Sequence, residues 1–187
     1  MKLKGIVLDK YKMVYWYLPK TCCTALKTHF AKDLGLTIPY RDGTEMDIHG
    51  QDIGFTFTEE VIQEYYNFAY VRNPFDRVMS LYSQKILSPV DRKVFPETYF
   101  YRDMPFELFL DGIINIPQKE RHYMPQSAML PEGIHIHKVE TDLFLKFITP
   151  ANISKAVNHW TPETKEKAYE FYKNDFIRFG YHYHKHL

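Results

Sequence analysis

The first residues suited to chemistry form a short turn at Pro19–Thr24, which reads PKTCCT. The apolar run 13–18 before it predicts a buried strand, and Ala25–Leu34 predicts a helix. A strand that turns directly into a helix presents backbone N–H groups at the positive end of the helix dipole, which suits a phosphate or a sulfate. Lys20 adds a mobile positive charge, and the two threonines add hydroxyl donors. The turn therefore predicts an anion site, with an ordinary strand-to-helix turn as the alternative.

A second group of candidate residues follows the apolar run 67–71, which predicts another strand. Asn73 and Pro74 have the pattern of a helix start, so Arg72 is placed at the carboxyl end of the strand, where open α/β sheets bind ligands. The helix predicted to run to about residue 86 carries Ser80. An arginine fork with a hydroxyl group is a good receptor for a terminal phosphate. The alternative is a structural arginine–aspartate pair within a capped helix.

Together the two segments resemble the motifs of the sulfotransferase superfamily that uses 3′-phosphoadenosine-5′-phosphosulfate (PAPS), especially its carbohydrate-type branch. In that family a PKTGCT- or PKTAGT-like turn holds the 5′-phosphosulfate, and an RNPxxRxxSxY segment holds the 3′-phosphate. The turn matches the first motif with Cys22 in place of the usual Gly or Ala, and Arg72–Tyr82 matches the second fully. The likeness also reaches Lys138–Leu143 and Tyr172–Tyr181, so that it covers nearly the whole chain.

The resemblance implies a PAPS-dependent sulfotransferase that releases 3′-phosphoadenosine-5′-phosphate (PAP). By the same resemblance, Arg72 and Ser80 recognise the 3′-phosphate, and Lys20 neutralises charge on the bridging leaving oxygen. The backbone N–H groups expected to hold the 5′-phosphate belong to Thr21, Cys22, Cys23 and Thr24. The scheme needs no metal, and no metal site is predicted.

A hydroxyl acceptor also needs a general base, and His49 is the first choice because a histidine pKa suits proton transfer near neutral pH. Related glycosaminoglycan and bacterial branches use a histidine in a comparable loop before the RNP-type motif. Glu45 and Asp47 lie nearby as carboxylate alternatives, and His122 is a third candidate.

The acceptor side is predicted in the segment Glu120–Ser127, which reads ERHYMPQS. The family carries a similar His-x-x-Pro-Gln-like segment there, so Arg121, His122 and Gln126 are expected to contact the acceptor. A hydroxyl on a small molecule or a glycan, most simply a carbohydrate, is the expected acceptor.

The remaining patterns complete a single α/β domain over residues 1–187, and the resemblance implies a P-loop-like, three-layer α/β/α fold with a central parallel sheet. A third strand is expected at 133–139 because its residues alternate. The other predicted helices are 61–66, 106–111, 141–147, 153–158 and a final helix from Thr161 to Phe179 with Gly180 as its C-cap.

The composition argues against several classes of function. Lys plus Arg is 24 against 23 for Asp plus Glu, which disfavours a nucleic-acid partner. The two cysteines are adjacent, so no disulfide framework is implied, and neither a signal peptide nor a membrane span is predicted, which favours a cytoplasmic enzyme. The oligomeric state is not predicted.

Two alternative functions stay open. One is a small nucleotide kinase, which the absence of GxxxxGK[ST] disfavours, and the other is an inactive domain that only binds the 3′-phosphoadenosine nucleotide.

Overall fold

The fold was analysed in a computed structural model that describes residues 3–38, 40–41, 44–45, 54–88, 99–116, 120–142, 144–148 and 158–183. The chain forms two compact units, each with its own core. The first unit comprises residues 1–71 and 130–153, and the second comprises residues 72–129 and 154–187.

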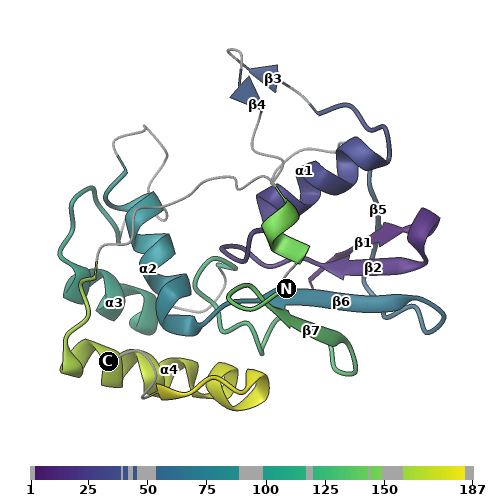
Figure 1. The fold of residues 1–187 in the computed structure, drawn as a ribbon. Coiled ribbons are helices and arrows are strands. Elements are labelled where there is room, and N and C mark those ends of the chain that lie inside the picture. The colour runs from purple at the N-terminus through teal and green to yellow at the C-terminus, as the bar shows by residue number, and fades with distance from the viewer. Residues whose placement is uncertain are drawn as a thin grey trace. The chain divides into compact units, whose positions relative to one another are not determined.

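The first unit is built on a five-stranded sheet with the order β5-β1-β2-β6-β7 (Figure 1). Its strands are β1 (Gly5–Leu8), β2 (Met13–Trp16), β5 (Thr56–Thr58), β6 (Tyr66–Val71) and β7 (His135–Lys138). β6 pairs in parallel with β2 on one side and with β7 on the other. The carboxyl ends of these three strands therefore lie at one edge of the sheet.

The predicted sheet was parallel, and the observed sheet is mixed because β1 runs antiparallel to both β2 and β5. β1 and β2 form a hairpin, and the single 3-10 turn Asp9–Tyr11 and Lys12 connect them. Lys12 has a φ of 53°, the left-handed conformation that lets the chain reverse. Neither β1 nor β5 was predicted, so the parallel expectation is correct only for β2, β6 and β7.

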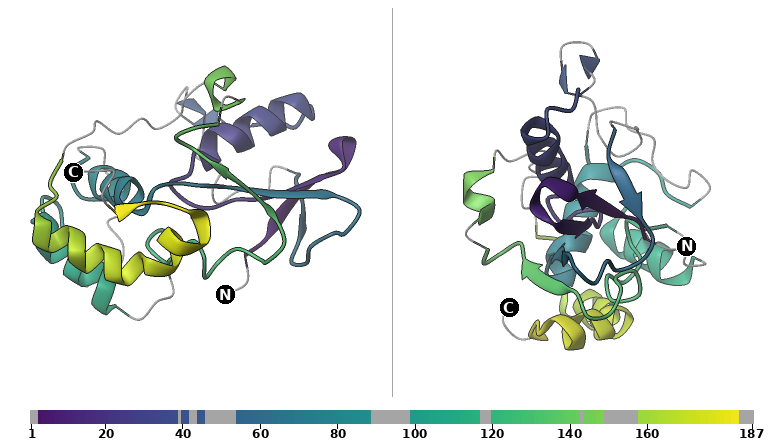
Figure 2. Two further views of the ribbon diagram at one scale, coloured as in Figure 1. Left: turned by 60° about the horizontal axis from the view of Figure 1, so that its bottom comes forward. Right: turned by 90° about the vertical axis from the view of Figure 1, so that its right-hand side faces the viewer.

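The helix α1 (Cys23–Asp33) lies against one face of this sheet in both Figure 1 and Figure 2. Its buried residues Leu26 and Phe30 pack on Tyr15 of β2 and Phe68 of β6. The 3-10 helix η2 (Phe144–Phe147) follows β7, and the ring of Phe144 contacts that of His29 on α1. A separate antiparallel pair consists of β3 (Tyr40–Arg41) and β4 (Thr44–Glu45).

The regular elements described in the second unit are helices. Its helices are α2 (Pro74–Lys85), α3 (Phe106–Asn115) and α4 (Pro162–Phe179), and α4 packs against both of the others. Their core is rich in rings, which include Phe75, Tyr82, Phe106, Phe109, Tyr172 and Phe176. Among the described residues, no helix is long and apolar enough to cross a membrane.

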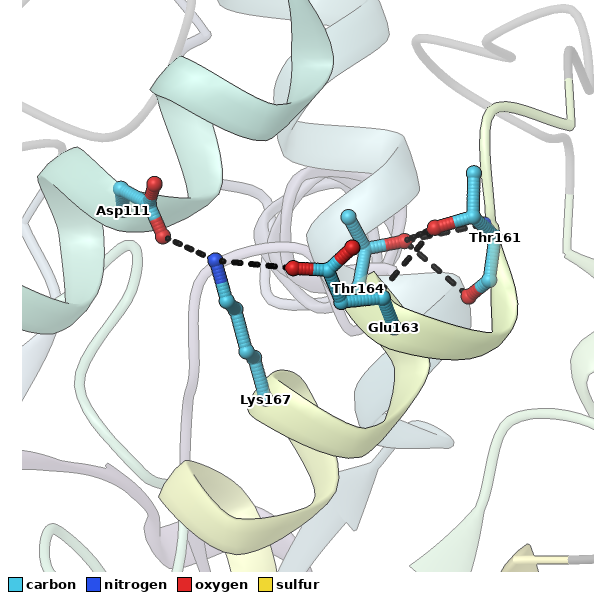
Figure 3. Close-up of polar contacts among 5 residues, drawn as sticks. All are labelled: Asp111, Thr161, Glu163, Thr164 and Lys167. Carbon is cyan, nitrogen blue, oxygen red and sulfur yellow. Dashed lines mark hydrogen bonds and ion pairs between the residues drawn. The ribbon is translucent and has the colours of Figure 1, made fainter.

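The predicted helix starts are confirmed at α2 and α4. Asn73 caps α2 by accepting from the N–H of Phe75 at 2.9 Å. Thr161 and Thr164 form a reciprocal capping box at the start of α4 (Figure 3). Gly180 ends that helix with a φ of 61°. Figure 3 also shows Lys167 of α4 between Asp111 of α3, at 3.3 Å, and Glu163.

Two other helix predictions had different outcomes. The helix expected at 61–66 is wrong: none of these residues is helical, and the last of them begins β6. The helix expected at 153–158 lies, apart from Asn158, outside the described residues.

Replacing Thr161 with Ala should lower the free energy of unfolding by about 1 kcal/mol, because the amide of Thr164 loses its cap acceptor. Urea denaturation measures the difference. Glu163→Gln serves as the matched control, since it keeps the cap and removes an exposed carboxylate that pairs with Lys167 and lies in the first turn of α4, and it should cost no more than about 0.5 kcal/mol. Equal losses in the two variants would contradict the assigned role of the cap.

Candidate functional site

The turn at Pro19–Thr24 connects β2 to α1, as its sequence predicts. Lys20 and Cys22 both adopt the left-handed conformation, with φ angles of 69° and 60°. Between them, Thr21 is fully buried and its hydroxyl donates to the carbonyl of Leu18 at 2.9 Å. The Thr21 side chain thus closes the turn from inside by a hydrogen bond within the turn.

The amino end of α1 has no competing negative charge of its own. Its N-cap, Cys22, makes no side-chain cap hydrogen bond, and the first turn contains no acidic residue. Most helices place an acidic or hydroxyl cap here, because the first N–H groups and the dipole favour one. This end of α1 is therefore suited to a bound anion.

Aromatic hydroxyl groups lie next to this turn within the first unit. The Tyr15 hydroxyl is buried and has no hydrogen-bond partner among the described residues. Burial raises the pKa of the Tyr15 phenol well above its ordinary value, and the nearby Cys23 and Cys22 thiols raise it further. The Lys27 ammonium lies 3.6 Å from the centre of the Tyr17 ring, a cation–π contact on the first turns of α1.

β6 and β7 add a chain of polar contacts on the same unit. The Tyr70 pKa is raised by burial first and then by the charge of Asp142 and a hydrogen bond to it. Asp142 also pairs with Nδ1 of His137 at 2.8 Å, and Nε2 of His137 lies 3.1 Å from the Tyr66 hydroxyl. His135 stacks on the Tyr66 ring. These imidazoles are thus occupied by sheet neighbours.

Arg72 is the first residue after β6 and belongs to the second unit. Its backbone is held at both polar groups: the N–H donates to Oε1 of Gln126 at 3.0 Å, and the carbonyl accepts from Nε2 of the same side chain at 2.8 Å. The side chain is half-buried. Among the described residues, its guanidinium makes no hydrogen bond or ion pair. An anion receptor requires a guanidinium group that can bind a ligand and that extends from a backbone held in place.

Ser80 and Arg77 lie on the helix that follows. Ser80 is buried, with 7% of its surface exposed. Arg77 is 1% exposed, and its two terminal nitrogens donate to the carbonyls of Met124 and Arg121, both at 2.8 Å. Arg77 therefore has a structural role, because it tethers the 121–124 segment to α2.

The predicted acceptor residues lie on this tethered segment. His122 is half-buried, and its Nδ1 lies 2.5 Å from Oε1 of Glu120. This hydrogen bond lowers the Glu120 pKa below its ordinary value. Arg121 is likewise half-buried, whereas Gln126 is fully buried and occupied with Arg72 and Asp175.

Three residues of α4 that the sequence reasoning did not select hold the same segment. The Tyr172 hydroxyl donates to the carbonyl of Tyr123 at 2.7 Å, and Arg178 donates to the carbonyl of Ser127 at 2.7 Å. Asp175 is fully buried and accepts from main-chain N–H groups of the segment. A sequence signal existed for Asp175, because it lies on the apolar stripe of α4, three residues after Tyr172.

Three of the four candidate general bases have no described side chain. His49 and Asp47 lie outside the described residues, and Glu45 belongs to β4, whose backbone alone is described. Within the described ranges, no group of three or more His, Cys, Asp or Glu residues could hold a metal ion.

A family model described as "Sulfotransferase family" matches residues 4–149. The matched range includes the turn at Pro19–Thr24, Arg72 with Ser80, and the segment Glu120–Ser127. It ends before α4 begins.

The chain is also similar to mouse carbohydrate sulfotransferase 14. The two are 31% identical over 86 residues, which is 43% of this chain and 23% of that relative. The match thus spans about a quarter of the length of the relative. No solved structure matches.

The two cysteines should differ in reactivity, because Cys22 is exposed and Cys23 is buried. We expect Ellman's reagent to modify one thiol per native chain rapidly and the second only after denaturation. In Cys22→Ser the rapid phase should disappear while the slow one remains. Two thiols reacting at one rate in the native protein would contradict the observed burial at the start of α1.

Proposed function

The chain belongs to the sulfotransferase family, and from this premise we propose that it transfers a sulfuryl group from PAPS to a hydroxyl group, with PAP as the second product. The observation that carries the proposal is Arg72. Its guanidinium has no partner among the described residues, its backbone is held on both sides, and Ser80 follows at the family's spacing. This pair would recognise a 3′-phosphate, the group that distinguishes PAPS from ATP.

The turn before α1 would hold the other end of the donor. We assign the 5′-phosphate to the backbone N–H groups of Thr21–Thr24, which include Cys22 and Cys23, because α1 presents its positive end without an acidic cap. Lys20 would neutralise the charge that develops on the bridging oxygen as the S–O bond to the 5′-phosphate breaks. The left-handed backbone of Lys20 and Cys22 supports a tight loop around an anion.

The acceptor oxygen forms the new bond to sulfur, and its proton needs a base. We propose His49 for this role, with Glu45, Asp47 and His122 as the alternatives. His122 gains support from its contact with Glu120, because a carboxylate at Nδ1 fixes the orientation of the ring.

We propose a carbohydrate as the acceptor, supported by the similarity to mouse carbohydrate sulfotransferase 14. Arg121 and His122 would contact it, since both side chains are half-buried on the segment 120–127. Gln126 would contribute by anchoring that segment. The finer fold proposal, a P-loop-like three-layer α/β/α arrangement acting as one domain over residues 1–187, rests on family membership together with the parallel strands β2, β6 and β7.

Calorimetric titration with PAP, ATP and 5′-AMP tests the donor site. PAP should bind at micromolar or lower concentration, about −8 kcal/mol or better, and more tightly than the two nucleotides that lack a 3′-phosphate. Arg72→Ala and Ser80→Ala should each weaken PAP and leave 5′-AMP unchanged. A preference for ATP would instead support a nucleotide kinase, and both motif assignments would then be wrong.

Transfer is tested with labelled PAPS and a panel of glycan acceptors. Lys20→Ala and His49→Ala should lose at least about 100-fold in turnover while PAP binding is kept, since both act on charge or protons that appear during transfer. Glu45→Gln, Asp47→Asn and His122→Gln serve as comparison variants for the base. Full activity in His49→Ala would move the base to whichever of these three is inactive. Tight PAP binding by the wild-type protein with no transfer to any acceptor would favour an inactive nucleotide-binding domain.

A further inference from the structure

We propose that Gln126 and Asp175 are positioning residues that fix Arg72 for recognition of a 3′-phosphate. The helix α4, which lies beyond the matched family segment, would through them take part in donor selectivity. This inference rests on the proposed function, because it assumes that Arg72 binds the 3′-phosphate of PAP.

The first step is the contact between Gln126 and Arg72. One side-chain amide pairs with both backbone groups of Arg72, at 3.0 and 2.8 Å, in the way that a neighbouring strand would. Arg72 directly follows the last residue of β6, so Gln126 continues strand-like hydrogen bonding one residue beyond the strand. The Cα of Arg72, from which the guanidinium extends, is thereby fixed.

The second step is the contact between Asp175 and Gln126. Oδ2 of Asp175 accepts from the main-chain N–H of Gln126 at 2.8 Å and from its Nε2 at 3.3 Å. Oδ1 accepts from the N–H of Ser127 at 2.7 Å. The same carboxylate therefore sets both the backbone and the amide orientation of Gln126, and it determines which end of the amide faces each backbone group of Arg72.

The burial of these groups indicates that the contacts are specific. Gln126 and Asp175 are both fully buried, and among the described residues Asp175 has no ion-pair partner. Removing a carboxylate from water is costly, and an apolar side chain would fill the position without that cost. What the carboxylate adds is direction, because its two oxygens accept three N–H groups of one short segment.

A fixed backbone position matters most for a residue with a long side chain, such as Arg72. The guanidinium has no described partner that holds it in the absence of ligand, so its placement depends on the backbone from which it extends. If that backbone moved by about 1 Å, the fork would no longer match a phosphate, and a displacement of this size commonly costs up to about 100-fold. The loss should affect only ligands that carry the 3′-phosphate.

The test compares PAP and 5′-AMP binding in the full chain by calorimetry. Gln126→Met keeps the length of the side chain and removes both contacts with Arg72, and Asp175→Asn keeps its shape while replacing an acceptor oxygen. Arg178→Met is the matched control, since Arg178 also ties α4 to this segment, at the carbonyl of Ser127, without contacting Arg72. Thermal unfolding is recorded for all variants.

We expect Gln126→Met and Asp175→Asn to weaken PAP about 10- to 100-fold with unchanged affinity for 5′-AMP. Arg178→Met should lower the unfolding temperature and keep the wild-type ratio of the two affinities. If the first two variants also keep that ratio, the inference is overturned and the contacts are only structural. A wild-type protein that fails to prefer PAP over 5′-AMP would overturn the proposed function itself.

If neither variant folds, amide hydrogen exchange in the wild-type protein decides the question. The amides of Arg72 and Ser127 report on the two ends of the network, because one donates to Gln126 and the other to Asp175. PAP should slow the exchange of both amides, and 5′-AMP should slow neither. Equal effects of the two nucleotides, or no effect of PAP, would overturn the inference.

Discussion

The parallel pairing of β6 with β2 and β7 is the constraint on which the rest of the first unit depends. It brings the carboxyl ends of three strands to one edge of the sheet, so the segments that follow them start from the same side. The turn before α1 follows β2, and the segment that carries Asp142 follows β7. Tyr70, near the end of β6, interacts electrostatically with Cys22 of the turn and with Asp142. Residues of β6, of the turn after β2 and of the segment after β7 therefore interact at this edge.

The second unit contains an irregular segment, residues 120–127, that is held in place without regular secondary structure. Backbone groups of a buried loop need partners, and here buried side chains supply them. Arg77 of α2 binds two carbonyls, and Asp175 of α4 binds two main-chain N–H groups. Each is a charged group in a buried site, which is unfavourable unless it is fully hydrogen-bonded. The segment 120–127 is thus hydrogen-bonded to both α2 and α4, and its Gln126 pairs with the backbone of Arg72.

The sheet shows where pattern reasoning failed. A parallel sheet was expected, and the observed pairings of β6 with β2 and β7 are parallel. β1 escaped notice because four apolar residues beside a charged turn have no helical or alternating period to identify them. Its partner β5 is three residues long and largely exposed, so that neither composition nor alternation separates it from a loop. β1 becomes a strand because it pairs with the edge of β2, and β5 becomes one because it pairs with β1.

The sequence by itself determined the local features of the site. These are the strand that turns into α1, the spacing between Arg72 and Ser80 along the chain, and the caps of α2 and α4. These depend on neighbours within a few residues, where propensity and side-chain caps act directly. Only the tertiary structure decided that Arg77 is structural, and that Gln126 holds a residue 54 positions away and is itself held by one 49 positions away. The physical reason is that a buried hydrogen bond specifies its partners by position in space. No periodic pattern in the sequence indicates which side-chain amide will pair with which backbone group once both are buried.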